Sequence, residues 1–316
     1  MGEARFIACD WGTSNLRLYL CQPANGASPV VVASNSGPGV ADAAGQFEEI
    51  FFDLVDEWLR DDAELPITIS GMVGSNIGWV EAPYLPCPAD AGMIAGSVTV
   101  FESRGKTLAI VAGLRTQNPL GVTDFLRGEE TQLLGWMTDA SARDAPRLAV
   151  LPGTHNKWAL LRGGRIESFL TAVTGELFHL LANHSVLVKS PAEAPPLDQA
   201  AFSAGLDTVE SLDGAELVHA LFSARSRQIS SCYSEPEAWS YLSGMVIGSD
   251  VAGALRLFSK RYSNLEDVVV IGDDRIAACY RMALDRRNVR HSAYDSTLAT
   301  LRGHEAVFRR RNELAK

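Results

Sequence analysis

Residues 7–20 read IACDWGTSNLRLYL, and residues 148–161 read LAVLPGTHNKWALL. Each stretch is an apolar strand, a Gly-Thr turn with polar residues behind it, and a second apolar strand. Setting Gly12 on Gly153 superposes the two stretches. The order of strands and helices that follows each turn is also similar, and this repetition favours two related lobes.

The spacing of apolar residues predicts the elements of each half. In the first half we expect three strands (5–10, 16–21 and 29–34), a helix (46–60), a strand (67–70), a loop rich in Gly and Pro (71–88), a further strand (107–112) and a helix (128–137). In the second half we expect three strands (147–151, 157–161 and 165–170), then helical stretches to residue 260 and a strand (267–271). A helix, a short strand and a helix follow over residues 275–311. The polar stretch 139–146 lies between them. The sequence therefore predicts an α/β chain with an N-terminal lobe over residues 1–145 and a C-terminal lobe over residues 146–316.

The composition excludes several classes of protein. The 316 residues are 47% hydrophobic and carry a formal charge of -10 at pH 7, which argues against a general affinity for nucleic acid or anionic membranes. We expect neither secretion nor membrane insertion, because no signal pattern and no apolar run of roughly 20 residues is present. The five cysteines have no CxxC or metal-ligand spacing, so free thiols in a reducing cytoplasm are expected. The oligomeric state stays open, and a homo-oligomer is compatible with the sequence.

The turn after the first strand carries groups that suit a phosphate chain. Asp10 ends the strand, Gly12 allows a tight turn, and Thr13 and Ser14 add hydroxyls to the backbone N–H groups. Asp10 is placed to hold a magnesium ion through water. A hairpin turn without any ligand explains this stretch equally well when it is taken alone.

The second turn repeats the pattern in the other half. Gly153, Thr154, His155 and Asn156 form it, and Lys157 adds a positive charge beside it. Two such turns, one in each lobe, predict that a triphosphate is clamped between the lobes.

Five stretches occur in order along the chain: DWGTSNLRLYL at 10–20, ISGMVGSNIGW at 69–79, RGEETQLLGW at 127–136, LPGTHNKWALL at 151–161 and SGMVIGSD at 243–250. Taken together they resemble the 2-dehydro-3-deoxygalactonokinase family, within the superfamily of sugar kinases, actin and heat-shock chaperone ATPases. The resemblance implies two similar actin-like (ribonuclease H-like) lobes with mixed sheets and an interlobe cleft. It implies that ATP and Mg²⁺ are bound and that 2-dehydro-3-deoxy-D-galactonate is phosphorylated at its terminal hydroxyl to the 6-phosphate, in galactonate catabolism.

The second turn departs from part of this superfamily. Leu151 and Pro152 stand where actin and hexokinase-like members have an acidic residue two positions before the glycine. This leaves Asp10 as the expected metal ligand. The resemblance also places the adenosine of ATP against small residues of the second lobe, where Gly244, Gly248 and Gly272 fit.

Phosphoryl transfer to a hydroxyl needs a carboxylate that orients the hydroxyl and accepts its proton. Glu129 and Glu130 follow Gly128 at the expected start of a helix, whose dipole favours their ionised form. An acid directly after a glycine resembles the base of glycerol-kinase-like enzymes, which favours Glu129, and Asp124 is a third candidate. Stabilisation of the helix start is the alternative role for both glutamates.

A sugar acid needs donors for its carboxylate, and arginine can bind a carboxylate through two parallel hydrogen bonds. Arg115 follows an apolar strand and Arg127 precedes the candidate base, with solvated surface arginines as the alternative. A glycine-rich loop is expected to contact the sugar through Gly71, Met72, Val73, Gly74 and Trp79. A packed turn with Trp79 in the core is the other interpretation. The rival functions are a kinase of another sugar or sugar acid and an ATP-driven binding module of the same fold.

Overall fold

The computed structural model describes residues 5–24, 28–139, 146–189, 195–212, 216–262, 265 and 267–314. The chain divides into two compact units, each described below by itself. Unit 1 comprises Met1–Asp144, Leu161–Phe169 and Tyr294–Lys316, and unit 2 comprises Ala145–Leu160 and Leu170–Ala293. The C-terminal segment thus groups with the N-terminal half, whereas the sequence assigned it to the second lobe. Most of the expected linker, residues 140–145, lies outside the described residues.

Unit 1 is built on a six-stranded sheet with the order β3-β2-β1-β4-β8-β7. Its strands are β1 (Phe6–Trp11), β2 (Asn15–Gln22), β3 (Val30–Pro38), β4 (Ile67–Ser70), β7 (Val98–Ser103) and β8 (Lys106–Val111). β1 runs antiparallel to β2 and parallel to β4, and β4 runs parallel to β8. Because Asp10 pairs with Ser70, the carboxyl ends of β1 and β4 lie at the same edge of the sheet, where the first Gly-Thr turn begins.

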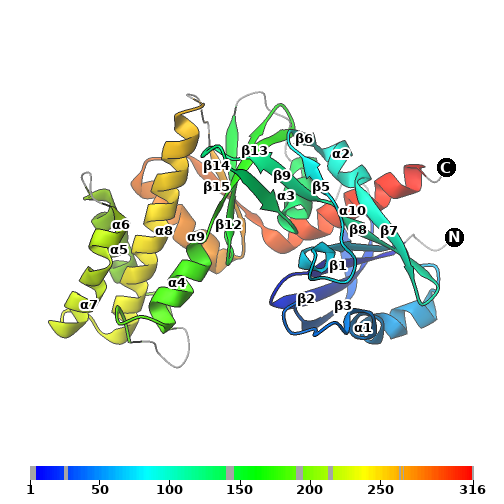
Figure 1. The fold of residues 1–316 in the computed structure, drawn as a ribbon, viewed down its shortest axis with the longest axis horizontal. Helices are drawn as coiled ribbons and strands as arrows, with labels where there is room; N and C mark the ends of the chain where they lie inside the picture. Colours follow the sequence, from blue (N-terminus) through cyan, green and yellow to red (C-terminus); the bar gives the residue numbers. More distant parts are fainter. Residues whose placement is uncertain are drawn as a thin grey trace. The chain divides into compact units, whose positions relative to one another are not determined.

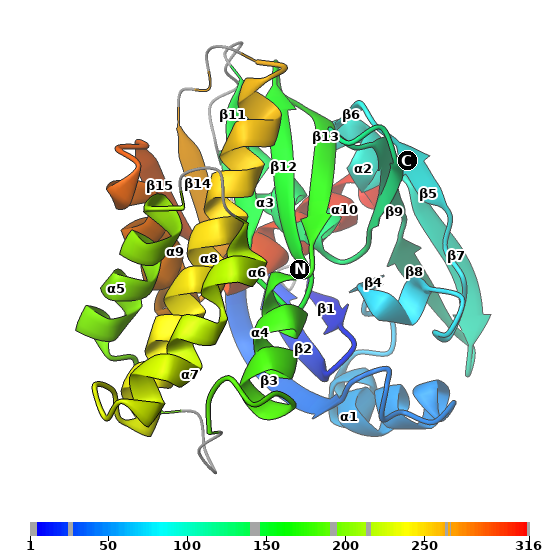
Figure 2. The ribbon, with the colours of Figure 1, turned by 60° about the vertical axis from the view of Figure 1, so that its left-hand side comes forward.

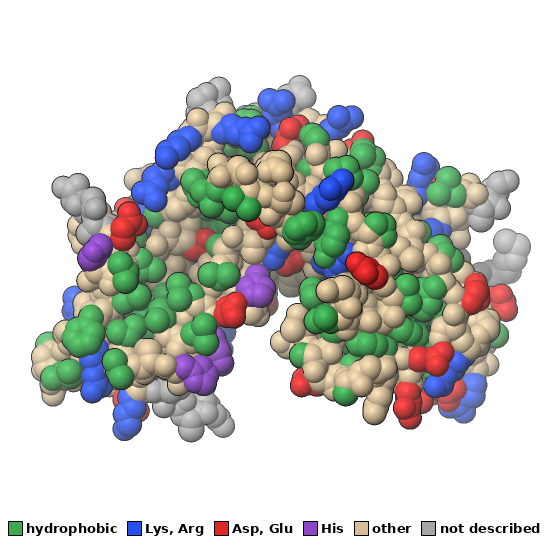
Figure 3. Space-filling view, viewed as in Figure 1, with side chains coloured by type: hydrophobic (Ala, Val, Ile, Leu, Met, Phe, Trp, Pro, Cys, Tyr) green, Lys and Arg blue, Asp and Glu red, His purple; other side chains and the backbone are tan. Residues whose placement is uncertain are grey.

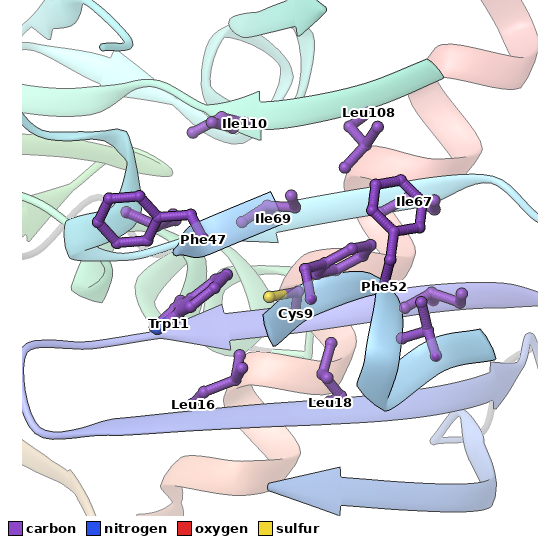
Figure 4. Close-up of a cluster of buried hydrophobic side chains, with 14 of the residues drawn as sticks. Cys9, Trp11, Leu16, Leu18, Phe47, Phe52, Ile67, Ile69, Leu108 and Ile110 are labelled. Carbon is purple, nitrogen blue, oxygen red and sulfur yellow. The ribbon is translucent and has the colours of Figure 1, made fainter. Parts of the chain in front are cut away.

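Helix α1 (Phe47–Asp61) packs on one face of this sheet (Figure 1). Alternate residues of β1 and β2 point to that face, as the period of two requires. Figure 4 shows Trp11 and Leu16 from these strands next to Phe47 of α1 and Ile69 of β4, all of them buried. The core of unit 1 therefore lies between α1 and the strands that carry the first turn.

Helix α10 (Ser296–Leu314) packs on the opposite face of the sheet and places a histidine against β4. His304 is fully buried. Its Nδ1 lies 2.8 Å from the hydroxyl of Thr68, and its Nε2 lies 3.1 Å from the hydroxyl of Ser70. Burial lowers the pKa of His304 to about 3, so the ring is neutral at neutral pH.

Helix α3 (Glu129–Asp139) crosses α10 at two glycines. A Cβ atom on Gly135 would overlap the carbonyl oxygen of Ala299, and one on Gly303 would overlap the carbonyl oxygen of Thr131. Only glycine allows backbones to approach this closely. The crossing therefore fixes α3, and with it the candidate base, against α10.

The structure contains short elements in unit 1 that the sequence did not predict. A three-stranded sheet has the order β10-β9-β5, and its hairpin β9–β10 leads directly into α3. These elements are β5 (Tyr84–Pro86), β6 (Ala89–Asp90), α2 (Ala91–Gly96), β9 (Gly113–Gln117) and β10 (Thr123–Leu126). The hairpin thus helps to set where the N-terminus of α3 lies.

Unit 2 holds most of a second six-stranded sheet, with the order β15-β14-β11-β12-β13-β6. Its further strands are β11 (Arg147–Leu151), β12 (Asn156–Arg162), β13 (Arg165–Ala172), β14 (Val268–Gly272) and β15 (His291–Asp295). Its helices are α4 (Thr174–Asn183), α5 (Gln199–Glu210), α6 (Leu217–Ala220), α7 (Phe222–Ile229), α8 (Glu235–Ser259) and α9 (Asp274–Arg286). Figure 2 shows α8 across the face of β11 and β12, and its apolar residues share a buried cluster with those strands.

No helix in the described ranges is both long and apolar enough to cross a bilayer. On the face that Figure 3 shows, Lys and Arg side chains are scattered among Asp and Glu side chains.

Candidate active site

The first Gly-Thr turn joins β1 to β2 and turns its carbonyl groups inward. The N–H of Gly12 donates to the carbonyl oxygen of Asn15 at 2.9 Å, and the N–H of Val40 donates to the carbonyl oxygen of Gly12 at 3.0 Å. The side chains of Thr13 and Ser14 are exposed at the tip. A tip with exposed hydroxyls and inward carbonyls suits an anionic ligand such as a phosphate.

Asp10 lies next to this turn, at the end of β1. Its carboxylate is 3.5 Å from the guanidinium of Arg17 on β2. Burial raises the pKa of Asp10, the charge of Arg17 opposes this shift, and the charge of Glu129 adds to it. The two predicted carboxylates therefore act on each other electrostatically. Within the described part of the chain, no group of three or more His, Cys, Asp or Glu side chains is placed to hold a metal ion.

Two glycines bring the start of α3 to the end of β1. Gly71 has a φ of 98° and Gly128 a φ of 105°, in the region that favours glycine. A Cβ atom on Gly71 would lie 2.5 Å from the carbonyl oxygen of Trp11, and one on Gly128 would lie 3.2 Å from the Cα of Gly71. This backbone packing places Glu129 at the sheet edge that also carries Asp10.

The adjacent acids Glu129 and Glu130 have different environments. Glu130 is fully buried and accepts hydrogen bonds from the N–H of Gly128 at 2.5 Å and the hydroxyl of Thr131 at 3.1 Å. Burial raises the pKa of Glu130 to about 8, and the charge of Glu129 adds to that shift. Glu129 is partly exposed. Glu130 therefore completes the first turn of its own helix, and Glu129 is the acid that a ligand can reach.

The loop after β4 begins with the 3₁₀ turn η1 (Met72–Gly74), and its own backbone holds it. The N–H of Trp79 donates to the carbonyl oxygen of Val73 at 2.8 Å. The side chain of Val73 is fully buried in the core. The Trp79 ring packs 5.2 Å from the ring of Phe101 and 5.7 Å from that of Phe51. The Val73 side chain therefore lies in the core, and the Trp79 ring packs against Phe101 and Phe51 as the second interpretation of this loop expects.

Arg127 is almost completely buried, with 8% of its surface exposed. Its guanidinium donates to the carbonyl oxygen of Ala82 at 2.6 Å and to the hydroxyl of Tyr84 at 3.2 Å, and it lies 4.2 Å over the Tyr84 ring. A Cβ atom on Gly74 would lie 2.9 Å from its Nη1. Among the described residues, Nη1 has no hydrogen-bond partner. Arg127 is therefore a packed residue and not the solvated arginine that the sequence left open.

The β9–β10 hairpin holds two further predicted site residues. Arg115 is exposed on β9, opposite Phe125 of β10. The carboxylate of Asp124 accepts hydrogen bonds from the side chain of Asn118 at 3.2 Å and the N–H of Phe125 at 2.9 Å. These bonds give Asp124 a role in holding the hairpin turn.

The second Gly-Thr turn joins β11 to β12 in unit 2. The N–H of Gly153 donates to the side-chain oxygen of Asn156 at 2.7 Å, and the N–H of Glu176 donates to the carbonyl oxygen of Thr154 at 3.0 Å. Thr154 and His155 are exposed, and Nε2 of His155 lies 2.7 Å from the Glu176 carboxylate. Lys157 is buried and donates to the carbonyl oxygen of His155 at 2.8 Å. As in the first turn, a backbone carbonyl oxygen of the turn accepts a hydrogen bond from a residue outside the turn.

A cavity of about 400 Å³ opens beside this turn within unit 2. The sequence did not identify Phe178 of α4 or Trp239 of α8 as site residues, although both line the cavity. Their rings lie 4.8 Å apart, edge to face. The remaining lining residues are Pro152, Gly153, Asn156, Thr174, Gly175, Leu197, Ser243, Ile247, Asp273, Arg275, Ile276, Cys279 and Tyr280. Aromatic residues on amphipathic helices gave no sequence signal that separates a ligand wall from a core.

Two of the three glycines predicted to contact adenosine lie at a helix contact within unit 2. A Cβ atom on Gly244 would overlap the carbonyl oxygen of Phe202 in α5, and one on Gly248 would lie 3.1 Å from Leu206 in the same helix. Both glycines thus face α5, and their small size lets α5 and α8 approach. A Cβ atom on Gly272, at the end of β14, would lie 3.6 Å from Pro152, which lines the cavity.

Comparison with known proteins gives one family. The model of the 2-keto-3-deoxy-galactonokinase family matches residues 10–307. A protein of Rhizobium meliloti (strain 1021), assigned as a 2-dehydro-3-deoxygalactonokinase, is 34% identical over 306 residues, which is 96% of each chain. The 2-dehydro-3-deoxygalactonokinase of Escherichia coli (strain K12) is 32% identical over 283 residues, which is 89% of each chain.

Solved structures agree with this family. A crystal structure from Sinorhizobium meliloti, described as a 2-dehydro-3-deoxygalactonokinase, has a TM-score of 0.81 and 34% identity over 96% of each chain. The activator of the 2-hydroxyisocaproyl-CoA dehydratase from Clostridium difficile, with bound ADPNP, has a TM-score of 0.52 and 13% identity over 98% of this chain and 97% of its own, and it shares the fold alone. The α/β fold with mixed sheets is thus the actin-like fold that the sequence predicted. From residue 10 to residue 307 the chain matches one family along its length, and it belongs to the 2-keto-3-deoxy-galactonokinase family.

Proposed function

We propose that this protein transfers the γ-phosphate of ATP to the terminal hydroxyl of 2-dehydro-3-deoxy-D-galactonate, giving the 6-phosphate in galactonate catabolism. The observation that carries this proposal is the position of Glu129, which is partly exposed at the same sheet edge as Asp10 and the first Gly-Thr turn. This edge combines a proton acceptor with donors for phosphate. The two relatives named for this activity, at 34% and 32% identity, support the choice of substrate.

The cavity of unit 2 suits the nucleoside of ATP. Its volume of about 400 Å³ is typical of pockets for small molecules. Phe178 and Trp239 offer apolar ring surfaces to a base, and Ser243 offers a hydroxyl. Gly153 and Asn156 line the same cavity, so a nucleoside bound there directs its phosphates toward the second Gly-Thr turn. Thr154 and His155 at the tip of that turn are the proposed phosphate contacts.

Asp10 is the residue that would hold Mg²⁺. Proteins bind this ion through one or two carboxylates, with phosphates and water as the other ligands. Asp10 fits because its carboxylate lies at the end of β1 beside the first Gly-Thr turn, and a cation there would favour the ionised form that burial disfavours. When bound, the ion neutralises charge on the phosphates. The hydroxyls of Thr13 and Ser14, exposed beside Asp10, are proposed to donate to phosphate oxygens.

Glu129 orients the substrate hydroxyl and accepts its proton while the hydroxyl oxygen attacks the γ-phosphorus and ADP leaves. Arg127 supplies a buried positive charge for the carboxylate of the sugar acid, and its Nη1 has no hydrogen-bond partner in the part of the chain that the structure describes. The backbone of Gly71, Met72 and Gly74 and the exposed Arg115 complete the proposed sugar-acid contacts. We place the protein in the cytoplasm, where its five free cysteines stay reduced.

The test is ATP consumption with Mg²⁺ against a panel of sugars, aldonic acids and 2-keto-3-deoxy acids, with an acceptor-free control. Activity confined to 2-dehydro-3-deoxygalactonate supports the proposal. Activity on a different acceptor would support the proposed phosphoryl transfer but identify another substrate. ATP hydrolysis that does not depend on any acceptor favours an ATP-driven binding module, and a lack of ATP turnover with every acceptor overturns the proposed function.

A further inference from the structure

A carboxylate on helix α8 is surrounded by buried donors and takes no part in the proposed reaction. Oδ2 of Asp250 accepts hydrogen bonds from Nδ2 of Asn156 and the hydroxyl of Tyr280, both at 2.8 Å, and Oδ1 accepts from Nε1 of Trp158 at 3.0 Å. Burial raises the pKa of Asp250, and these bonds, with one from Thr174, oppose the shift. All four donor residues are 7% exposed or less. The carboxylate thus joins β12, α4 and α9 to α8.

Asn156 connects this carboxylate to the second Gly-Thr turn. Its Oδ1 accepts from the N–H of Gly153 at 2.7 Å, and its Nδ2 donates to Asp250 and Tyr280. An ionised carboxylate only accepts hydrogen bonds, so Asp250 requires the NH₂ end of the carboxamide to face it. With the carboxamide reversed, its NH₂ group would face the N–H of Gly153, donor against donor. Asp250 therefore determines which end of Asn156 meets the turn.

The first Gly-Thr turn has no such dependence. There the N–H of Gly12 donates to the backbone oxygen of Asn15, whose side chain is exposed. The two turns have the same Gly-Thr-x-Asn pattern, but only the second turn uses the Asn side chain to hold its glycine N–H. The conformation of the second turn thus depends on a residue that lies on another element.

We propose that Asp250 is a positioning residue for nucleotide binding, which acts through Asn156 to hold the second Gly-Thr turn in its phosphate-binding conformation. This inference rests on the proposed function, in that the turn must bind the phosphates of ATP. Asp250 does not line the cavity itself, whereas Asn156 and Tyr280 do. Its effect is therefore on the geometry of the turn and not on direct contact with the nucleotide.

The test is the affinity for Mg·ATP by calorimetry, with thermal unfolding measured on the same samples. Asp250→Asn replaces an acceptor by an NH₂ group, so we expect the Kd to rise about tenfold or more. Trp158→Phe is the matched control, because it removes a hydrogen bond from the same carboxylate without touching Asn156. It is expected to lower the unfolding temperature and leave the Kd within about twofold of wild type. An equal rise of Kd in both variants would mean that Asp250 only stabilises unit 2, and the inference would be lost.

A double-mutant cycle gives a second measurement, so that the inference does not rest on Asp250→Asn alone. Asn156→Ala leaves Asp250 with its bonds from Tyr280, Trp158 and Thr174, so the fold is kept, and we expect the same rise in Kd. Adding Asp250→Asn to Asn156→Ala should change the Kd little further, because the Asn156 side chain through which Asp250 acts is already missing. Additive losses, or an Asn156→Ala protein that binds ATP like wild type, would refute the inference. A wild-type protein that binds no nucleotide would instead refute the proposed function.

Discussion

Gly71 lies directly behind Trp11, so that a Cβ atom on Gly71 would come within 2.5 Å of the Trp11 carbonyl oxygen and 2.8 Å of its carbonyl carbon. On its other side, Gly71 meets Gly128 at the start of α3. Two residues without side chains thus set the spacing between the strand end that carries Asp10 and the helix start that carries Glu129. The geometry of the proposed transfer site therefore depends on this backbone contact.

Gly71→Ala tests that contact. The substitution forces a side chain into a left-handed φ of 98° and against the Trp11 carbonyl, so we expect kcat/KM to fall at least about tenfold and the free energy of unfolding to fall by about 2–4 kcal/mol. Gly105→Ala is the control, since Gly105 has a φ of 71° and open space around its Cβ position. It should lose only about 1–2 kcal/mol of stability and keep its kcat/KM. Wild-type kcat/KM in Gly71→Ala would show that the contact does not set the site.

Glu129→Gln and Glu130→Gln form a matched pair. Glu129→Gln removes the proposed proton acceptor, so its kcat should fall by about 10²–10⁴-fold while the KM for ATP changes little. Glu130→Gln should keep kcat within about threefold, because burial already favours the neutral form of Glu130, which a glutamine resembles. Steady-state kinetics on both proteins check this. If kcat fell more in Glu130→Gln than in Glu129→Gln, Glu130 would be the proton acceptor instead of Glu129.

The sequence predicted the parts of the fold that local patterns specify. The two Gly-Thr turns and their flanking strands repeat a clear alternation, and β1 with β2 and β11 with β12 follow them. The strands β5, β9 and β10 have three to five residues, too few for an alternation to be recognised, and the first of them lies in the segment that was predicted as a loop. Their existence depends on pairing with each other and not on their own residues.

The candidate site residues were predicted where a local signal marks them. Asp10 lies two residues before Gly12 of the first turn and Glu129 directly follows Gly128, and the roles of both acids stay predictions. Asp250 was not found, because a single Asp on a helix resembles a solvated residue, and its partner Asn156 is 94 residues away. Gly244 shows a second difficulty, since a close helix contact and a nucleotide contact both select a small residue, and the Cβ position of Gly244 faces Phe202 of α5.

The buried His304 makes stability depend on pH in a defined window. Its folded pKa of about 3 lies below the unfolded value of 6.5, so the unfolded chain binds more protons between these values. Stability is therefore fully present above pH 6.5 and decreases as the pH falls toward 3, with a slope that approaches about 1.4 kcal/mol per pH unit. Glu130 acts in the opposite sense, because its folded pKa of about 8 exceeds its unfolded value of 4.5. Its contribution to the free energy of unfolding therefore decreases as the pH rises through that range.

Denaturant unfolding of the wild type and of His304→Gln at several pH values separates the two groups. Glutamine does not titrate, so the difference in unfolding free energy between the two proteins should be largest near pH 7 and shrink toward pH 4. Glu130→Gln, measured in parallel, should flatten the decrease of stability above pH 6.5. A difference between wild type and His304→Gln that is the same at pH 7 and pH 4 would mean that His304 is protonated inside the fold.

Trp239 provides a test of the proposed nucleoside cavity. Its ring forms one wall and is held edge to face against Phe178 at 4.8 Å. Stacking of a base on an aromatic ring contributes about 1–3 kcal/mol, so Trp239→Ala should raise the KM for ATP roughly tenfold. The KM for the sugar acid should stay unchanged, because the proposed contacts of that substrate lie in unit 1. Trp239→Phe keeps an aromatic surface and should recover most of the affinity for ATP. If both KM values rise together in Trp239→Ala, the residue supports the fold of unit 2 and the base binds elsewhere.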